Sequence, residues 1–266
     1  MRIGIVGCGG RMGRMVLQAV LVTEGVHLSG GVERPGHDAI GADLAALVGA
    51  APIGLALSGD VEALFAGSDA VIDFTTPELT AANAGRAARL GVALVCGTTG
   101  LSAAQREALA DAATVVPIVY AANMSVGVNL LIGLTRRVAA TLAAGYDIEI
   151  VEMHHRHKTD APSGTALALG QAAADGRCVS LDDVAVRSRD GRIGARPEGA
   201  IGFATLRGGD VVGEHTVIFA GEGERIELTH KASSRAVFAH GAVRAAQWTA
   251  GRAAGLYGMT DVLGLT

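Results

Sequence analysis

The first 125 residues alternate short, largely apolar runs with longer segments of helical periodicity, and this alternation limits the possible folds most strongly. Strands that are apolar along their whole length are typical of parallel sheets, because helices then cover both faces. Strands that alternate with helices form βαβ units. The pattern therefore predicts an α/β domain with a parallel sheet. We expect strands at 3–6, 26–33, 69–74, 92–96 and 115–119, with helices at 12–22 and from Pro77.

The remainder of the chain has a different pattern. One long helix is expected over 125–144, with Ser125 as its N-cap. Five strand candidates follow, several of them separated by glycine-rich turns, and a last helix is expected over 236–253. These features predict a second domain with a sheet of mixed or antiparallel character, beginning near residues 123–125. The strand candidates are 146–154, 184–188, 200–206, 210–219 and 225–231.

Charge and cysteine content narrow the class of protein. A net charge of -4 argues against non-specific nucleic-acid binding, which needs a broad cationic surface. No secretory signal is visible, and no run of about 18 uncharged apolar residues predicts a membrane span. Cys8, Cys96 and Cys178 are odd in number and far apart, which fits neither a disulfide framework nor a CxxC metal site. We therefore expect a cytoplasmic protein.

The segment GIVGCGGRMG follows the first strand and opens the first helix. Its glycines permit a tight turn and close approach of the backbone to a pyrophosphate at the helix N-terminus. Glu33, at the end of the second strand, is placed where an acid binds the ribose hydroxyls of NAD, and Arg34 suits a 2′-phosphate. The alternative is a glycine turn that only allows close packing. The combination favours a dinucleotide site that accepts both NADH and NADPH.

The segment HHRHKTDAPSGTA at 154–166 concentrates cationic capacity just before an expected helix start. A metal site is disfavoured, because adjacent histidines do not converge easily on one ion. A solvated charged turn is the second interpretation, but it does not explain why a helix start follows directly. The free N–H groups of Ser163, Gly164 and Thr165 would bind an anion, and His154 or Lys158 would donate a proton after hydride transfer, with neighbouring cations lowering their pKa values. A site for a small carboxylate substrate is the third interpretation.

Seven motifs, in order, resemble the 4-hydroxy-tetrahydrodipicolinate reductase (dihydrodipicolinate reductase) family of diaminopimelate and lysine biosynthesis. The resemblance implies a Rossmann-like domain over 1–124, completed by 236–266, and a smaller α/β domain with a mixed or antiparallel sheet over 125–235. The second domain would bind substrate and build a homotetramer. The motifs are VGCGGRMG, VER, CGTTG, AANMSVGVN, EMHHRHKTDAPSGTA, GFATLRGGDVVGEHTVIF and THKASSR.

The resemblance also assigns roles to individual residues. His154 and Lys158 would be catalytic, and His155, Gly164 and Thr165 would bind the carboxylates of the substrate. Thr76 stands where some relatives have a basic residue, so the resemblance does not decide between NADH and NADPH. The residues expected to bind the dinucleotide are Gly7, Cys8, Gly9, Gly10, Arg11, Met12, Glu33, Arg34, Gly97, Thr98, Thr99, Ala121, Ala122, Asn123 and Met124.

The implied reaction is hydride transfer from NADH or NADPH to a cyclic dicarboxylate, with loss of water and protonation by His154 and Lys158. Neither step can be assigned to one of these two residues from the sequence. We expect no metal, no nucleic acid and no membrane as partners. Two other classes stay open at this point: a module that binds NAD(P)H without chemistry, and a metal-dependent hydrolase that uses the histidines.

Overall fold

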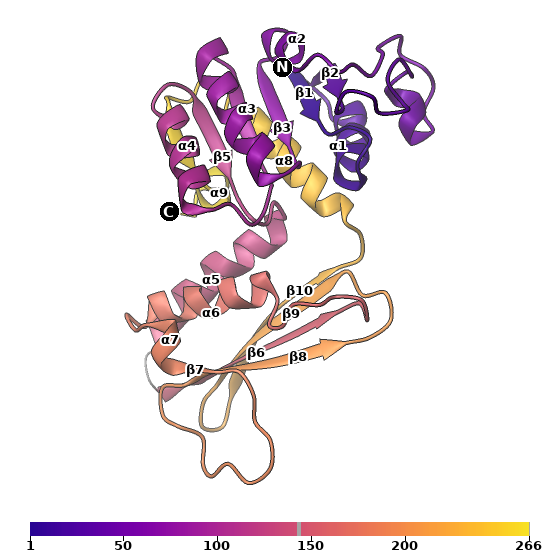
Figure 1. The fold of residues 1–266 in the computed structure, drawn as a ribbon. Helices are drawn as coiled ribbons and strands as arrows, with labels where there is room; N and C mark the ends of the chain where they lie inside the picture. The colour runs from indigo at the N-terminus through magenta and orange to yellow at the C-terminus, as the bar shows by residue number, and fades with distance from the viewer. Residues whose placement is uncertain (143–144, 266) are drawn as a thin grey trace. The chain divides into compact units, whose positions relative to one another are not determined.

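The computed structural model describes residues 1–142 and 145–265, and Figure 1 shows the order of its helices and strands. The chain divides into two compact units. The first comprises Met1–Val126 and Ala236–Thr266, and the second comprises Gly127–Arg235. The prediction of an α/β fold with one parallel sheet and one mixed sheet is confirmed.

The first unit contains a six-stranded sheet with the order β11-β5-β4-β3-β1-β2, in which every pairing is parallel. All five strands expected from the sequence are present. The sixth, β11, was missed because its three residues show no periodicity, and only their pairing with β5 makes them a strand. The strands are β1 Arg2–Val6, β2 His27–Val32, β3 Ala70–Asp73, β4 Ala93–Cys96, β5 Pro117–Tyr120 and β11 Gly255–Tyr257.

Helices cover both faces of this sheet, and each face has its own hydrophobic cluster. The last long helix, α8, packs against α1 although more than 200 residues separate them in sequence. Its Gly241 lies so close to the Met124 carbonyl that a Cβ atom would be 1.8 Å from the oxygen. The helix ends at Trp248 rather than at residue 253. Gly251 has a φ of +73°, which is incompatible with a right-handed α-helix. The helical segments are α1 Arg11–Val22, η1 Ala45–Val48, α2 Val61–Ala66, α3 Pro77–Leu90, α4 Ala103–Ala113, α8 Ala236–Trp248 and α9 Met259–Leu263.

The second unit contains a five-stranded sheet with the order β10-β9-β6-β8-β7. Strand β9 is antiparallel to both of its neighbours, whereas β8 is parallel to β6 and β7. Side chains along β6 alternate between buried and half-buried, and helices cover the buried face (Figure 1). The elements are α5 Val126–Leu142, β6 Asp147–His154, α6 Gly164–Gly176, α7 Leu181–Val184, β7 Ala185–Val186, β8 Ile201–Arg207, β9 Gly213–Ala220 and β10 Arg225–Ala232.

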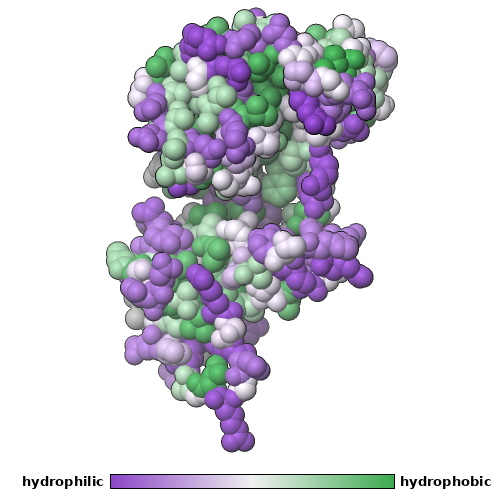
Figure 2. All heavy atoms as spheres, in the orientation of Figure 1, coloured by the Kyte–Doolittle hydropathy of each residue, from purple (hydrophilic) through white to green (hydrophobic). Residues whose placement is uncertain are grey.

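The boundaries of two predictions in this unit need comment. Helix α5 begins at Val126, as expected from Ser125 as its cap, but the expected end at residues 143–144 lies outside the described residues. The strand predicted at 184–188 is only Ala185–Val186, because α7 occupies the preceding residues. Among the described residues, no helix has the length and apolar character needed to span a membrane. Figure 2 shows hydrophilic and hydrophobic residues intermixed on the visible surface of each unit.

Candidate active site

The glycine-rich loop between β1 and α1 depends on two close backbone approaches. Gly7 has a φ of +78°, which favours glycine, and a Cβ atom on Gly13 would lie 1.9 Å from the Gly7 carbonyl oxygen. The N-cap of α1 is Gly10, which has no side chain to accept a hydrogen bond from the first turn. Helix α1 therefore begins with open N–H groups and with Arg11, an arrangement that suits an anion.

A cavity of about 570 Å³ lies beside this loop. Four of the residues expected to bind the dinucleotide line it, namely Gly7, Gly10, Glu33 and Arg34. Residues from the segment after β3 and from α3 also line the cavity, and of these the sequence had connected only Thr76 with the dinucleotide. The position of these residues follows from the neighbouring β1 and β3, whose carboxyl ends meet at one edge of the sheet. The additional lining residues include Phe74, Thr75, Thr76, Leu79, Asn83 and Arg86.

Glu33 is joined directly to the glycine-rich loop. Its Oε1 accepts a hydrogen bond of 2.9 Å from the Gly9 N–H, and its Oε2 accepts one of 3.1 Å from the Arg34 N–H. A Cβ atom on Gly9 would meet the His37 ring at 2.9 Å. The carboxylate is thus held at the edge of the cavity where an acid can accept hydrogen bonds from ribose hydroxyls.

Cys8 belongs to the expected set, but its side chain points away from a ligand. The residue is fully buried, its thiol lies 3.6 Å from the Ile5 carbonyl oxygen, and its N–H donates to the Val32 carbonyl. Burial is the main cause that raises the pKa of the thiol to about 12. Cys8 therefore shapes the loop through its small size, while Gly10 and Arg11 are the exposed residues of the loop and of the helix start.

The loops after β4 and β5 lie at the same carboxyl edge of the sheet but do not line the cavity. Gly97 is packed against Phe74, whose ring a Cβ atom would approach to 2.1 Å. Thr98 is buried and accepts a hydrogen bond of 2.8 Å from the Thr80 hydroxyl, whereas Thr99 is exposed. In the second loop, Ala122 is exposed and Met124 is buried, with Ala121 and Asn123 between these extremes.

Cys96 ends β4 and is fully buried. Burial raises the pKa of its thiol to about 11, and the nearby Asp73 carboxylate adds to the rise. A thiol that is protonated at neutral pH and closed to solvent is a poor nucleophile. Cys96 therefore belongs to the hydrophobic cluster on one face of the sheet.

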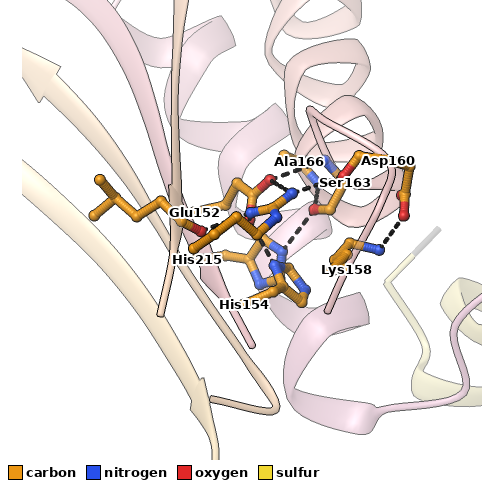
Figure 3. A network of polar contacts seen from close by, with 9 residues as sticks. Glu152, His154, Lys158, Asp160, Ser163, Ala166 and His215 are labelled. Atoms are coloured by element: carbon orange, nitrogen blue, oxygen red, sulfur yellow. Dashed lines mark hydrogen bonds and ion pairs between the residues drawn. The ribbon is translucent and has the colours of Figure 1, made fainter. Parts of the chain in front are cut away.

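In the second unit, a network of buried polar side chains surrounds the end of β6 (Figure 3). Glu152 and His154 are two residues apart on one strand, so both project onto the buried face of the sheet. Glu152 Oε2 lies 2.5 Å from His154 Nδ1. Only 1% of Glu152 and 8% of His154 are exposed. The sequence predicted a role for the histidine but not for its carboxylate partner, although their spacing on one strand is a signal that points to the pair.

Three donors hold the Glu152 carboxylate. Arg207 makes two hydrogen bonds of 2.8 and 3.0 Å, and the Ser163 N–H donates to Oε1 over 3.0 Å. Burial acts to raise the pKa of Glu152, but the hydrogen bonds from Arg207, His154 and Ser163 together lower it below its ordinary value. Arg207 reaches this position because parallel pairing of β6 with β8 sets it opposite His154.

Ser163 corrects one expectation from the sequence. It is the N-cap of α6, where its hydroxyl accepts a hydrogen bond of 3.2 Å from the Ala166 N–H. Its own N–H, expected to be open to an anion, is bonded to Glu152 instead. The Ser163 N–H is therefore not available to an anion.

His215 on β9 is the second imidazole of the network. Its Nε2 lies 3.1 Å from the Ser163 hydroxyl, and its ring meets the His154 ring edge-on with centroids 5.1 Å apart. Burial is the largest cause that lowers the pKa of His215 to about 4, and the neighbouring His154 contributes further. His215 is therefore neutral at neutral pH. The sequence analysis missed it, because only strand pairing brings it to the site.

The pKa of His154 is lowered, but chiefly for a reason other than the one expected. Burial is the largest cause, while Lys158 and Arg207 lower the pKa by smaller amounts. The Glu152 carboxylate acts in the opposite direction and favours the imidazolium. The expected effect of neighbouring cations on His154 is thus present but secondary to desolvation.

The loop after β6 carries the remaining predicted residues. Lys158 Nζ lies 2.7 Å from Asp160 Oδ1, and this ion pair is the main cause that lowers the pKa of Asp160. His155 Nδ1 is buried and has no hydrogen-bond partner among the described residues. Among the described residues, no group of three or more His, Cys, Asp or Glu side chains is arranged to hold a metal ion.

Two family models match the chain. The model described as dihydrodipicolinate reductase, N-terminus, matches residues 1–124, and the model described as dihydrodipicolinate reductase, C-terminus, matches residues 127–263. Among solved structures, the dipicolinate-bound dihydrodipicolinate reductase from Paenisporosarcina sp. TG-14 has a TM-score of 0.77 and 25% identity and covers 98% of both chains. The amine dehydrogenase of Mycobacterium smegmatis shares the fold, with a TM-score of 0.60 at 13% identity.

Curated relatives agree with the family models. The 4-hydroxy-tetrahydrodipicolinate reductase of Rhodopseudomonas palustris (strain BisB5) is 56% identical over 265 residues, which is 100% of this chain and 98% of the relative. The reductase of the same name from Alkalilimnicola ehrlichii is 55% identical and covers 99% of both chains. The chain therefore belongs to the 4-hydroxy-tetrahydrodipicolinate reductase family, also called the dihydrodipicolinate reductase family.

Proposed function

We propose that this protein reduces 4-hydroxy-tetrahydrodipicolinate to tetrahydrodipicolinate with NADH or NADPH, in diaminopimelate and lysine biosynthesis. Relatives of this name align over the full length of the chain, and a structural relative binds dipicolinate, a planar cyclic diacid. The observation that carries the proposal is the buried His154, which is held by a carboxylate at the end of a strand and is followed by Lys158.

The first unit fits the dinucleotide. Its uncapped helix start and Arg11 would hold the pyrophosphate, and the carboxylate of Glu33 would accept hydrogen bonds from the ribose next to adenine. Arg34 and Arg86 line the same cavity and would favour a 2′-phosphate. The bound dinucleotide supplies the hydride. We assign the nicotinamide end to the loops at 97–99 and 121–124, which lie at the carboxyl edge of the same sheet.

The second unit fits a small diacid. His155, whose buried Nδ1 has no hydrogen-bond partner among the described residues, and the start of α6 at Gly164 and Thr165 would bind the carboxylates. His154 would donate a proton to the electron-rich atom that hydride addition creates. Lys158 would polarise the substrate or assist the loss of water, and substrate binding would compete with Asp160 for its ammonium group.

We further propose a cytoplasmic homotetramer built by the second unit. The face of its sheet opposite the helices carries apolar side chains, and Leu206 on that face is 49% exposed. The three free cysteines suit a reducing compartment. Light scattering on the purified protein tests the assembly, and a monomer at micromolar concentration would refute it.

The activity is tested by a coupled assay in which the preceding synthase supplies fresh substrate and the oxidation of NADH or NADPH is followed by absorbance. The change His154→Gln should lower turnover by about 10²–10⁴-fold and leave dinucleotide affinity unchanged. A wild-type protein that binds NADPH but does not oxidise it in the presence of substrate would refute the proposed function. A His154→Gln variant with wild-type turnover would remove His154 from the mechanism.

A further inference from the structure

We propose that Glu152 is a positioning residue that fixes His154 as the Nδ1–H tautomer and thereby directs its Nε2 to deliver the proton. The inference rests on the proposed function and adds a residue to it. It follows from the hydrogen-bond partners of the carboxylate, from the surroundings of Nε2 and from the arrangement of charges around the imidazole.

The partners of Glu152 determine which ring nitrogen carries the hydrogen. An ionised carboxylate only accepts hydrogen bonds, and the Arg207 guanidinium and the Ser163 N–H only donate them. These donors keep Glu152 ionised and fix both of its oxygens. The contact of 2.5 Å between Oε2 and His154 Nδ1 then requires a hydrogen on Nδ1. The neutral imidazole is left with an unprotonated Nε2, and the imidazolium carries its transferable proton there.

The surroundings of Nε2 leave it available for substrate. Within the described part of the chain, Nε2 has no hydrogen-bond partner, and Gly213 on β9 lies beside it. A Cβ atom at position 213 would lie 3.0 Å from Nε2. A glycine at position 213 places no side-chain atom beside Nε2, whereas any larger residue would crowd it.

The charges around His154 oppose its protonation except for Glu152. Arg207 on β8 and Lys158 in the loop after β6 are both cationic, and each disfavours a second positive charge on the ring. His215 on β9 contacts the ring edge-on and is neutral at neutral pH. Glu152 is thus the group that stabilises the imidazolium before it gives its proton to the substrate. In that step the Nε2–H bond breaks, its electron pair stays on the ring, and the proton joins the site made electron-rich by hydride addition.

The variant that tests this role is Glu152→Gln, which keeps the shape of the side chain but replaces an acceptor with an amide that also donates. The amide can donate to Nδ1 and so permits the Nε2–H tautomer. We expect kcat to fall by about 10²-fold, with KM within about threefold of wild type. The pH above which kcat declines should move down by about one unit, because the carboxylate that favours the imidazolium is lost.

The matched control is Glu149→Gln. Glu149 lies on the same strand, is paired with Arg189 and Arg196, and projects onto the opposite face of the sheet. We expect this variant to lose stability but to keep the kcat and pH profile of wild type. Equal losses of kcat in both variants would show that Glu152 acts only through folding and would overturn the proposal.

A second measurement depends neither on the folding of the Glu152→Gln variant nor on enzyme activity. The ¹⁵N chemical shifts of labelled histidine in the wild-type protein, assigned with the His154→Gln spectrum, report the tautomer directly. Neutral His154 should carry its hydrogen on Nδ1, and an Nε2–H tautomer in the wild type would overturn the proposal even if the enzyme is active. An inactive wild-type protein with the Nδ1–H tautomer would instead refute the proposed function alone.

Discussion

Removing Arg207 should destabilise the fold through the carboxylate it leaves behind. Glu152 is 1% exposed in the wild-type structure, and Arg207→Met removes two of its charge-assisted hydrogen bonds. Breaking a buried ion pair by removing one partner costs about 3–5 kcal/mol. We expect the lower end, about 3 kcal/mol at pH 7.5, because the Arg207 side chain is 20% exposed and the Ser163 N–H still holds Glu152. For a chain of this size the melting temperature should fall by about 6–12 °C.

The pH dependence separates this cause from a loss of packing. In the wild type, the pKa of Glu152 is lowered in the folded state. Ionised Glu152 therefore stabilises the fold at pH values above the ordinary pKa of a glutamate, and this stability is lost as the pH falls through the folded-state pKa. Without Arg207, burial should raise the pKa of Glu152 above its ordinary value, so the carboxyl becomes neutral on mild acidification. The difference in the free energy of unfolding between Arg207→Met and wild type should therefore be larger at pH 7.5 than at pH 5.

The assay is urea unfolding followed by circular dichroism at one fixed protein concentration, at pH 7.5 and pH 5. The double variant Glu152→Gln with Arg207→Met has no buried charge at this position and should recover more than half of the lost stability. The reasoning is refuted if Arg207→Met lies within about 0.5 kcal/mol of wild type at pH 7.5. It is also refuted if the double variant is no more stable than the single one.

Three further outcomes are expected. The change Gly213→Ala should lower kcat by about tenfold, because the new Cβ atom crowds His154 Nε2 at 3.0 Å, and steady-state kinetics with an unchanged dinucleotide Kd would show this. Iodoacetamide at pH 7.5 should modify the exposed Cys178 and neither buried cysteine, as mass spectrometry would detect. Burial lowers the folded-state pKa of His215 to about 4, so the free energy of unfolding of the protein should fall by about 2–3 kcal/mol between pH 7 and pH 4. In urea unfolding, His215→Phe should remove this part of the pH dependence.

The sequence by itself determined the elements whose signals are local. Alternation of apolar runs with helical segments predicted five of the six strands of the parallel sheet, and glycine spacing predicted the turn at Gly7. These predictions succeed because periodicity, turn geometry and side-chain type are properties of neighbouring residues in the chain.

The tertiary structure alone decided which groups meet. Strand register set Arg207 opposite His154 and brought His215 from β9 to the same ring, and the Ser163 N–H was taken by Glu152 rather than left for an anion. Strand β11 exists only through its pairing with β5. Such contacts join residues up to about 140 positions apart. They depend on which strands pair and in which register, and no local pattern of residues encodes that choice.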